Sequence, residues 1–237
     1  MTGADSLDAR PPLDFRQKLH LRAGLGLIFD LDGVIIDSMP FHRRAWQRYL
    51  EVTGIGSGDS LDFMHGQRNE EIVRGLLGPE ADLATVIAHG AAKEQMYRDM
   101  LRDRLDEHLV PGIAEWLEHV SGAPIALATN AERANVDFVL EGGKLRPYFE
   151  AIVDGSQVEK AKPAPDVYLR AAELLKIAPR NCVVFEDSPV GVAAAVAAGM
   201  RVVGVLTHAT ALQDVRFSIA NFLDARLDSW LSAQSLE

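Results

Sequence analysis

The chain is poor in cysteine and in positive charge. Cys182 is its single cysteine, so no disulfide can form within the chain, and its place in the apolar run 182–185 predicts a buried thiol. The 237 residues include 24 lysines and arginines against 34 aspartates and glutamates, a formal net charge of -10. Nucleic acids and anionic membranes are bound through clustered basic residues. We therefore expect neither as a partner, whereas a small anionic ligand can still bind where positive charge gathers locally.

Long apolar runs and several common binding motifs are also missing. No run reaches the roughly 18 apolar residues that span a bilayer, and residues 1–23 contain no secretory apolar stretch. We expect a cytoplasmic protein whose residues 1–23 form a partly disordered tail. Gly24 and Gly26 stand at the start of the first apolar run instead of after it, which argues against a dinucleotide site. The sequence also lacks a Walker A motif and a His-Glu-x-x-His zinc motif.

Short apolar runs that stop at polar residues recur along the chain. They lie at residues 25–29, 124–128, 182–185, 201–205 and, more weakly, 151–153. Apolar residues at helical spacing lie between them, at residues 112–120, 133–140, 164–175 and 189–198. This alternation predicts an α/β fold with a Rossmann-like parallel sheet and helices on both faces. In such a sheet the polar residues that follow the strands meet at one edge, where ligands bind.

One long stretch interrupts the alternation. Between about residues 40 and 108 the sequence contains only helical patterns, at residues 41–52, 69–77 and 83–105. This predicts an α-helical cap domain over residues 40–109, inserted into a core domain made of residues 24–39 and 110–237. We expect the connections near residues 38–40 and 110–112 to act as hinges, and the protein to be a monomer or a weak dimer.

Pairs of carboxylates follow two of the predicted strands. Asp30 and Asp32 come after the first run, and Glu186 and Asp187 after the run at 182–185. A carboxylate can attack phosphorus if a divalent cation neutralises the charge repulsion and a second acid protonates the leaving oxygen. Four carboxylates gathered without a cation would be costly, and an oxygen-rich site suits Mg²⁺. Taken alone, Asp-Leu-Asp-Gly at positions 30–33 is equally typical of a simple turn.

Three further polar residues are candidates for the same edge. Lys162 precedes a predicted helix, and its ammonium group could hold a phosphate and the nucleophile together; a solvated lysine at a helix start is the alternative. Thr129 offers a hydroxyl and Asn130 a backbone amide at a strand-to-helix turn, where phosphoryl oxygens could bind. A helix N-cap role for one of them is compatible with that function.

These segments together resemble the haloacid dehalogenase-like superfamily, subfamily I with a helical cap, in its beta-phosphoglucomutase-like and sugar phosphatase branch. The resemblance covers almost everything from Leu25 to Leu206. It rests on four motifs in order: Asp-Leu-Asp-Gly-Val at 30–34, Thr-Asn at 129–130, Lys-Pro at 162–163, and Glu-Asp-Ser-Pro-Val-Gly at 186–191.

The resemblance implies a role for each motif residue. Asp30 would be the nucleophile that forms an aspartyl-phosphate, Asp32 the general acid and base, and Thr129 and Lys162 the ligands of the phosphoryl group. It also implies a Mg²⁺ ion held by the residues Asp30, Asp32 (through its backbone carbonyl), Glu186 and Asp187. The dehalogenases of the superfamily lack the second aspartate because they have no alkoxide to protonate, so Asp32 favours phosphate esters.

The predicted cap offers weaker candidates for substrate binding. Lys93 is the only lysine between residues 41 and 108 and resembles a cap lysine of beta-phosphoglucomutases that contacts substrate; a helix-surface position is the alternative. Ser38 and His42 resemble hinge residues that assist proton handling, although His42 could equally pack at a helix start. Gly66 and Arg68 resemble a cap loop that reads the substrate, with the arginine one position closer to the glycine than in the mutases.

The resulting functional hypothesis is an enzyme acting on a small phosphorylated metabolite. The first hypothesis is hydrolysis of a phosphate monoester, with a sugar phosphate as the expected substrate. The alternative is isomerisation of a hexose phosphate through the same intermediate. The mutases carry small and amide residues after the threonine, where this chain has Glu132 and Arg133. Glu132 would repel a second phosphate unless Arg133 turns inward. A non-catalytic binding module is a third hypothesis, disfavoured because every catalytic position is filled.

Overall fold

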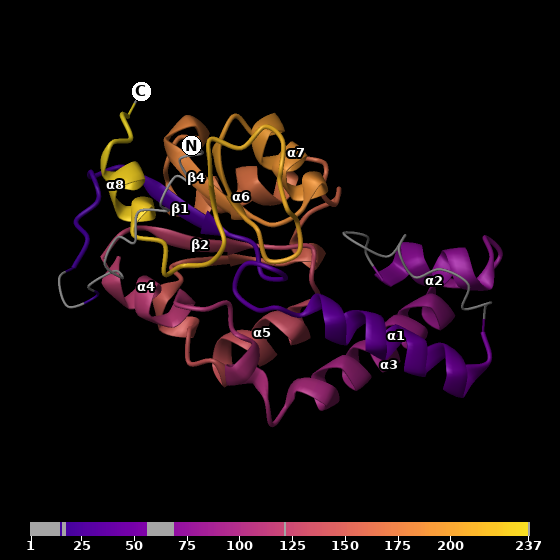
Figure 1. Cartoon of the computed structure of the whole chain (residues 1–237). Helices are drawn as coiled ribbons and strands as arrows, with labels where there is room; N and C mark the ends of the chain where they lie inside the picture. The colour runs from indigo at the N-terminus through magenta and orange to yellow at the C-terminus, as the bar shows by residue number, and fades with distance from the viewer. Residues whose placement is uncertain (1–14, 16–17, 56–68, 121, 237) are drawn as a thin grey trace, which may run out of the picture.

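The computed structural model describes residue 15 and residues 18–55, 69–120 and 122–236. Within them, six strands form one sheet in the order β3-β2-β1-β4-β5-β6 (Figure 1). All neighbouring strands are parallel. The predicted α/β fold is therefore confirmed. The strands are β1 (Gly26–Phe29), β2 (Ile125–Ala128), β3 (Ala151–Val153), β4 (Cys182–Glu186), β5 (Arg201–Val205) and β6 (Phe217–Ile219).

Helices cover both faces of this sheet because successive strand residues point to opposite sides. In β1, Leu27 and Phe29 belong to one apolar cluster and Ile28 to another. The first cluster includes side chains of α4 (Ile113–His119), α5 (Arg133–Gly142) and α8 (Arg226–Ser232). The second includes side chains of α6 (Asp166–Leu175) and α7 (Pro189–Ala197). With both faces covered, the central strands read as continuous apolar runs.

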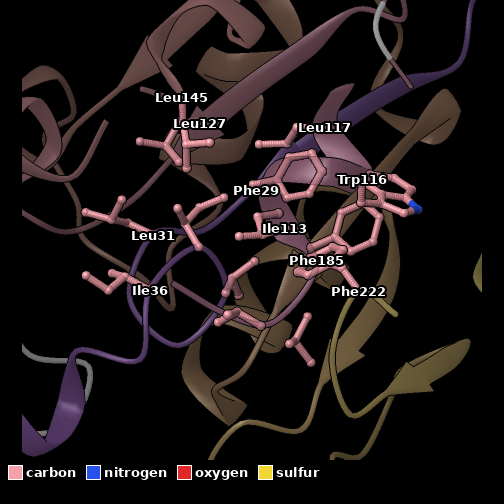
Figure 2. Packing of buried hydrophobic residues seen from close by; sticks show 14 of the residues in the cluster. Phe29, Leu31, Ile36, Ile113, Trp116, Leu117, Leu127, Leu145, Phe185 and Phe222 are labelled. Atoms are coloured by element: carbon pink, nitrogen blue, oxygen red, sulfur yellow. The ribbon is translucent and has the colours of Figure 1, made fainter. Parts of the chain in front are cut away.

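Aromatic rings support the sheet where its acidic residues begin. Phe29 of β1 and Phe185 of β4 are paired in register, and their rings stack 4.4 Å apart at an interplanar angle of 5°. Trp116 and Phe222 pack against them (Figure 2). Such rings bury large apolar areas in a defined geometry. Because Asp30 and Glu186 directly follow the two stacked residues, this core places their carboxylates on adjacent strands.

Among the described residues, three α-helices between β1 and α4 lie beside the sheet, beyond its carboxyl edge (Figure 1). They are α1 (Met39–Thr53), α2 (Asn69–Leu77) and α3 (Leu83–Leu101), and they share an apolar cluster that includes Trp46, Ile72 and Val86. The third helix is shorter than the predicted 83–105. It ends at Leu101, and Arg104, with φ of -134°, lies outside the helical region before a short 3₁₀ helix, Leu105–His108.

The structure contains two elements near the C-terminus that the sequence patterns do not predict. Both β6 and α8 are short, so neither presents enough of a period to be recognised. Within the predicted tail, residues 1–14 and 16–17 lie outside the described residues, whereas the backbone N–H of Leu19 donates to the carbonyl of His119 at 2.9 Å. No described helix combines the length and apolar character needed to cross a membrane.

Candidate active site

The loop after β1 presents two aspartates at the carboxyl edge of the sheet. The backbone N–H of Gly33 donates to the carbonyl of Ile36 at 2.8 Å, which closes the turn behind Asp30 and Asp32. Gly33 has φ of +78°, and a Cβ at this position would lie 1.9 Å from Asp187 Oδ2. Only glycine fits there. Residues 30–33 are therefore a turn that also brings the loop after β1 against Asp187, which follows β4.

Lys162 connects the two acidic segments. Its Nζ lies 2.7 Å from Asp30 Oδ1 and 2.7 Å from Glu186 Oε1, and the residue is 7% exposed. The alternative of a solvated lysine is thus wrong. The Asn130 side chain helps to place it, because Asn130 Oδ1 accepts the backbone N–H of Lys162 at 3.1 Å. The two carboxylates raise the pKa of Lys162 against the opposing effect of burial, so this lysine is a cation.

Glu186 is surrounded by hydrogen-bond donors of the protein. Its Oε1 also accepts the hydroxyl of Tyr168 at 2.6 Å, and its Oε2 accepts the backbone N–H groups of Asp187 and Ser188 and the Ser188 hydroxyl. Burial opposes ionisation, yet these donors and Lys162 lower the pKa of Glu186. A Cβ at Gly191 would lie 1.7 Å from Glu186 Oε1, so the start of α7 is closed around this carboxylate.

Asp187 has the opposite environment. It is 5% exposed, and its Oδ2 has no hydrogen-bond partner in the part of the chain that the structure describes. Burial, together with the charges of Glu186 and Asp30, raises the pKa of Asp187 well above its ordinary value. An acceptor-only group left unpaired in a buried place is costly. A cation beside Asp187 would remove that cost.

A metal ion fits this arrangement. One ligand oxygen each from Asp30, Glu186 and Asp187 lie within 4.8 Å of one another. Burial, opposed by Lys162 and reinforced by Glu186 and Asp32, raises the pKa of Asp30 to about 7. Three carboxylates around one point suit a hard cation such as Mg²⁺. Since Glu186 is already satisfied by protein donors, Asp30 and Asp187 are the carboxylates with the greater need of such an ion.

Thr129 and Asn130 follow β2 at the same edge. The Thr129 hydroxyl oxygen accepts the backbone N–H of Ala131 at 3.1 Å, which leaves the hydroxyl proton free to be donated. Neither residue is the N-cap of α5, because Glu132 occupies that position. The N-cap alternative is therefore wrong.

Asp32 contacts residues at the start of α1. Ser38 Oγ donates to Asp32 Oδ1 at 2.5 Å, and His42 Nε2 lies 3.3 Å from the same oxygen. Burial opposes ionisation of Asp32, but these two contacts lower its pKa. Its side chain is 26% exposed, so it also reaches solvent. The structure thus brings Ser38 and His42 into contact with Asp32.

Lys93 lies inside this group of helices. It is 1% exposed, and its Nζ is 2.8 Å from His42 Nδ1 and 2.8 Å from Glu94 Oε1. The alternative of a helix-surface lysine is therefore wrong. Lys93 is connected to Asp32 indirectly: its Nζ contacts one ring nitrogen of His42, and the other ring nitrogen contacts Asp32. Gly66 and Arg68 lie outside the described residues.

Several residues of the site belong to none of the sequence motifs and are not predicted from them. The sequence suggests only core packing for Tyr168 in α6 and an ordinary polar position for Asn135 in α5. In the structure, Tyr168 donates to the buried carboxylate of Glu186 and Asn135 to that of Glu94. Glu94 could have been suspected only from its place beside Lys93. These contacts join residues of different elements, 18 and 41 positions apart in the chain, so they become visible only in the tertiary structure.

Comparison with known proteins agrees with this geometry. The family model for haloacid dehalogenase-like hydrolases matches residues 26–199. Fructose-1-phosphate phosphatase YqaB of Escherichia coli is 36% identical over 184 residues, 76% of this chain and 95% of that protein. Hexitol phosphatase A of Escherichia coli is 34% identical over 189 residues, and beta-phosphoglucomutase of Bacillus subtilis 33% over 189 residues, each covering 76% of this chain and 82% of the relative.

Solved structures show the same fold. A HAD hydrolase of family IA, variant 3, from Entamoeba histolytica superposes with a TM-score of 0.76 at 24% identity, covering 89% of this chain and 100% of that one. Beta-phosphoglucomutase from Clostridium difficile gives a TM-score of 0.74 at 23% identity, covering 87% and 96%. On the family match and the identity to curated relatives, the chain is an enzyme that belongs to the haloacid dehalogenase-like hydrolase family.

Proposed function

We propose that this chain is a Mg²⁺-dependent phosphatase that hydrolyses a small phosphate monoester, in the first place a sugar phosphate, with Asp30 as nucleophile. The observation that carries the proposal is the buried cluster of Asp30, Glu186 and Asp187 with Lys162 bound to two of its members. The similarity to a fructose-1-phosphate phosphatase and a hexitol phosphatase supports a sugar phosphate as substrate.

The first chemical step uses both aspartates of the β1 loop. A carboxylate oxygen of Asp30 attacks phosphorus, and the bond from phosphorus to the leaving oxygen breaks. Asp32, whose pKa is lowered in the free protein, takes up a proton when the anionic substrate binds and gives it to that leaving oxygen. Lys162 Nζ, 2.7 Å from Asp30, and the Thr129 hydroxyl would donate to the phosphoryl oxygens. A bound Mg²⁺ would neutralise negative charge on the carboxylates and the phosphate.

The second step regenerates the enzyme. A water molecule attacks phosphorus, Asp32 accepts the proton of that water, and the bond from phosphorus to the Asp30 oxygen breaks. Phosphate leaves, and Asp30 returns to a carboxylate. The partial exposure of Asp32 supports this role, because a general base must reach the attacking water.

The residues after Thr129 support hydrolysis over phosphate migration. Arg98 Nη1 lies 2.8 Å from Glu132 Oε1, and Arg133 Nε lies 2.8 Å from both carboxylate oxygens of Asp137. Arg133 therefore does not turn inward to offset Glu132. Both arginines are already engaged by carboxylates, which disfavours the binding of a second phosphate at this place.

A product assay separates the alternatives. The purified protein with Mg²⁺ is incubated with a panel of sugar phosphates, including fructose 1-phosphate, and released inorganic phosphate is followed over time. A parallel reaction with β-glucose 1-phosphate is assayed for glucose 6-phosphate. We expect phosphate release and no glucose 6-phosphate. Isomerisation without phosphate release would favour the mutase, and no reaction with any ester would favour a binding module.

A further inference from the structure

Glu94 lies at the centre of a buried polar network that the proposed reaction does not use. Its Oε1 accepts Lys93 Nζ at 2.8 Å and Asn69 Nδ2 at 2.6 Å, and its Oε2 accepts Asn135 Nδ2 at 2.7 Å. The residue is 2% exposed. Burial opposes its ionisation, but the Lys93 ammonium group and these hydrogen bonds lower the pKa of Glu94. Glu94 is therefore a carboxylate that three donors hold in one place.

The network continues from Lys93 to the proposed general acid. Lys93 Nζ lies 2.8 Å from His42 Nδ1, and the other ring nitrogen of His42 lies 3.3 Å from Asp32 Oδ1. The ring itself is held by stacking on Tyr97, with centroids 3.9 Å apart. Glu94 cannot replace Lys93 as the partner of His42 Nδ1, because its Oε2 is 3.7 Å away.

The direction of each hydrogen bond in the series from Lys93 to His42 to Asp32 follows from the chemistry of Lys93. An ammonium group only donates, so His42 Nδ1 must accept from Lys93. A neutral imidazole that accepts at Nδ1 carries its proton at Nε2, the atom that faces Asp32. The tautomer of His42 is thus determined by the charge on Lys93.

The charge on Lys93 depends in turn on Glu94. Lys93 is 1% exposed, and its Nζ lies 5.1 Å from the centroid of the Trp46 ring. Burial lowers the pKa of Lys93, whereas Glu94 opposes that effect most strongly, followed by the more distant Asp32 and Glu132. Among these carboxylates, Glu94 is the one that contacts the ammonium group directly.

We propose that Glu94 is a positioning residue for Asp32: it holds Lys93 as an ammonium ion, and Lys93 thereby fixes His42 with its proton on Nε2, directed at Asp32. The inference rests on the proposed function for the role of Asp32. The contact between Glu94 and Asn135 anchors the network on α5 of the sheet domain, so its geometry depends on how α3 lies against α5.

The tautomer of His42 tests the proposal without any turnover. We would record ¹⁵N NMR spectra of the His42 ring in the full chain, in the wild type, in Glu94→Gln and in Asp99→Asn. Asp99 is a matched control, because it is an exposed acid of the same helix, paired with Arg102. We expect a single tautomer protonated at Nε2 in the wild type and the control, and a substantial population protonated at Nδ1 in Glu94→Gln. A wild-type ring protonated at Nδ1, or an unchanged tautomer in Glu94→Gln, would overturn the proposal.

A leaving-group comparison tests the consequence for Asp32. Phenyl phosphate needs a protonated leaving oxygen more than p-nitrophenyl phosphate does, although the two substrates have nearly the same shape. We expect Glu94→Gln to lower kcat with phenyl phosphate about tenfold or more, within the roughly 10²–10⁴-fold contribution of general acid catalysis, and to change kcat with p-nitrophenyl phosphate much less. Equal losses with both substrates would indicate a merely structural role. Glu94→Asp, which keeps the charge, should recover part of the loss.

Two controls keep these outcomes interpretable. Thermal unfolding shows whether Glu94→Gln is folded; if it is not, the double variant Lys93→Met/Glu94→Gln removes both buried charges and should give the same leaving-group selectivity. A wild-type protein that releases no phosphate from any ester would contradict the proposed function, whereas the NMR result would still decide the role of Glu94.

Discussion

Lys162 Nζ and Asp30 Oδ1 lie 2.7 Å apart in the interior, although 132 residues separate them in the chain. The same ammonium group lies 2.7 Å from Glu186 Oε1. A single side chain thus balances part of the charge of two buried carboxylates on adjacent strands. Removing it leaves both of them without their cation.

Replacing Lys162 should therefore affect both stability and catalysis. In Lys162→Met, we expect the free energy of unfolding, measured by urea denaturation with a chelator present, to fall by about 3–5 kcal/mol, because one partner of a buried ion pair is lost. Turnover should be lost as well. Lys160→Met is the control, since Lys160 is exposed and two residues away. A decrease below about 1 kcal/mol, the range of an exposed pair, would contradict the account.

Glycine at the start of α7 should be essential for the site. A Cβ at Gly191 would collide with the Glu186 carboxylate, whereas a Cβ at Gly75, in α2, has no atom within 4 Å. We expect Gly191→Ala to destroy phosphatase activity and lower the melting temperature. Gly75→Ala should leave activity unchanged and stabilise the protein by about 0.5–1 kcal/mol, because alanine favours a helix. Comparable activity in the two variants would show that the turn around Glu186 tolerates a side chain.

The raised carboxyl pKa values predict how stability depends on pH without metal. Folding raises the pKa of Asp30 to about 7 and that of Asp187 well above its ordinary value, so between about pH 5 and 7 the folded chain binds more protons than the unfolded one. As the pH rises through this range, the free energy of unfolding should therefore fall by about 1.4 kcal/mol per pH unit for each such group. Glu94, Asp32 and Glu186 have lowered pKa values and do not change protonation in this range.

Mg²⁺ should reduce the loss of stability that the metal-free protein shows as the pH rises. We expect the rise in melting temperature on adding Mg²⁺ to be larger at about pH 8 than at about pH 5.5, because the ion replaces protons on the carboxylates. Thermal unfolding at both values, with Mg²⁺ or a chelator, measures the difference. In Asp187→Asn the rise should be small at both. An equal rise at both pH values in the wild type would argue against a metal bound by these carboxylates.

The sheet and its motifs could be predicted from the sequence, because buried parallel strands read as apolar runs that end at polar residues. The runs before Asp30 and Glu186 are strands β1 and β4 as expected. The side chains that set the chemistry of the site could not be predicted. Tyr168 donates a hydrogen bond to Glu186, and Asn135 donates one to Glu94. Each bond joins two different elements, and no local sequence pattern indicates such a contact. The short β6 and α8 carry too few residues for a period to be recognised.

The most direct test of the central claim is phosphate release by Asp30→Asn in the presence of Mg²⁺. The substitution keeps the shape of the side chain and removes the nucleophilic charge, so the variant should fold, as judged by circular dichroism, and release no phosphate above the blank. Asp37→Asn, in the same loop and 40% exposed at its side chain, should keep its activity. If Asp30→Asn released phosphate at the wild-type rate, Asp30 would not be the nucleophile.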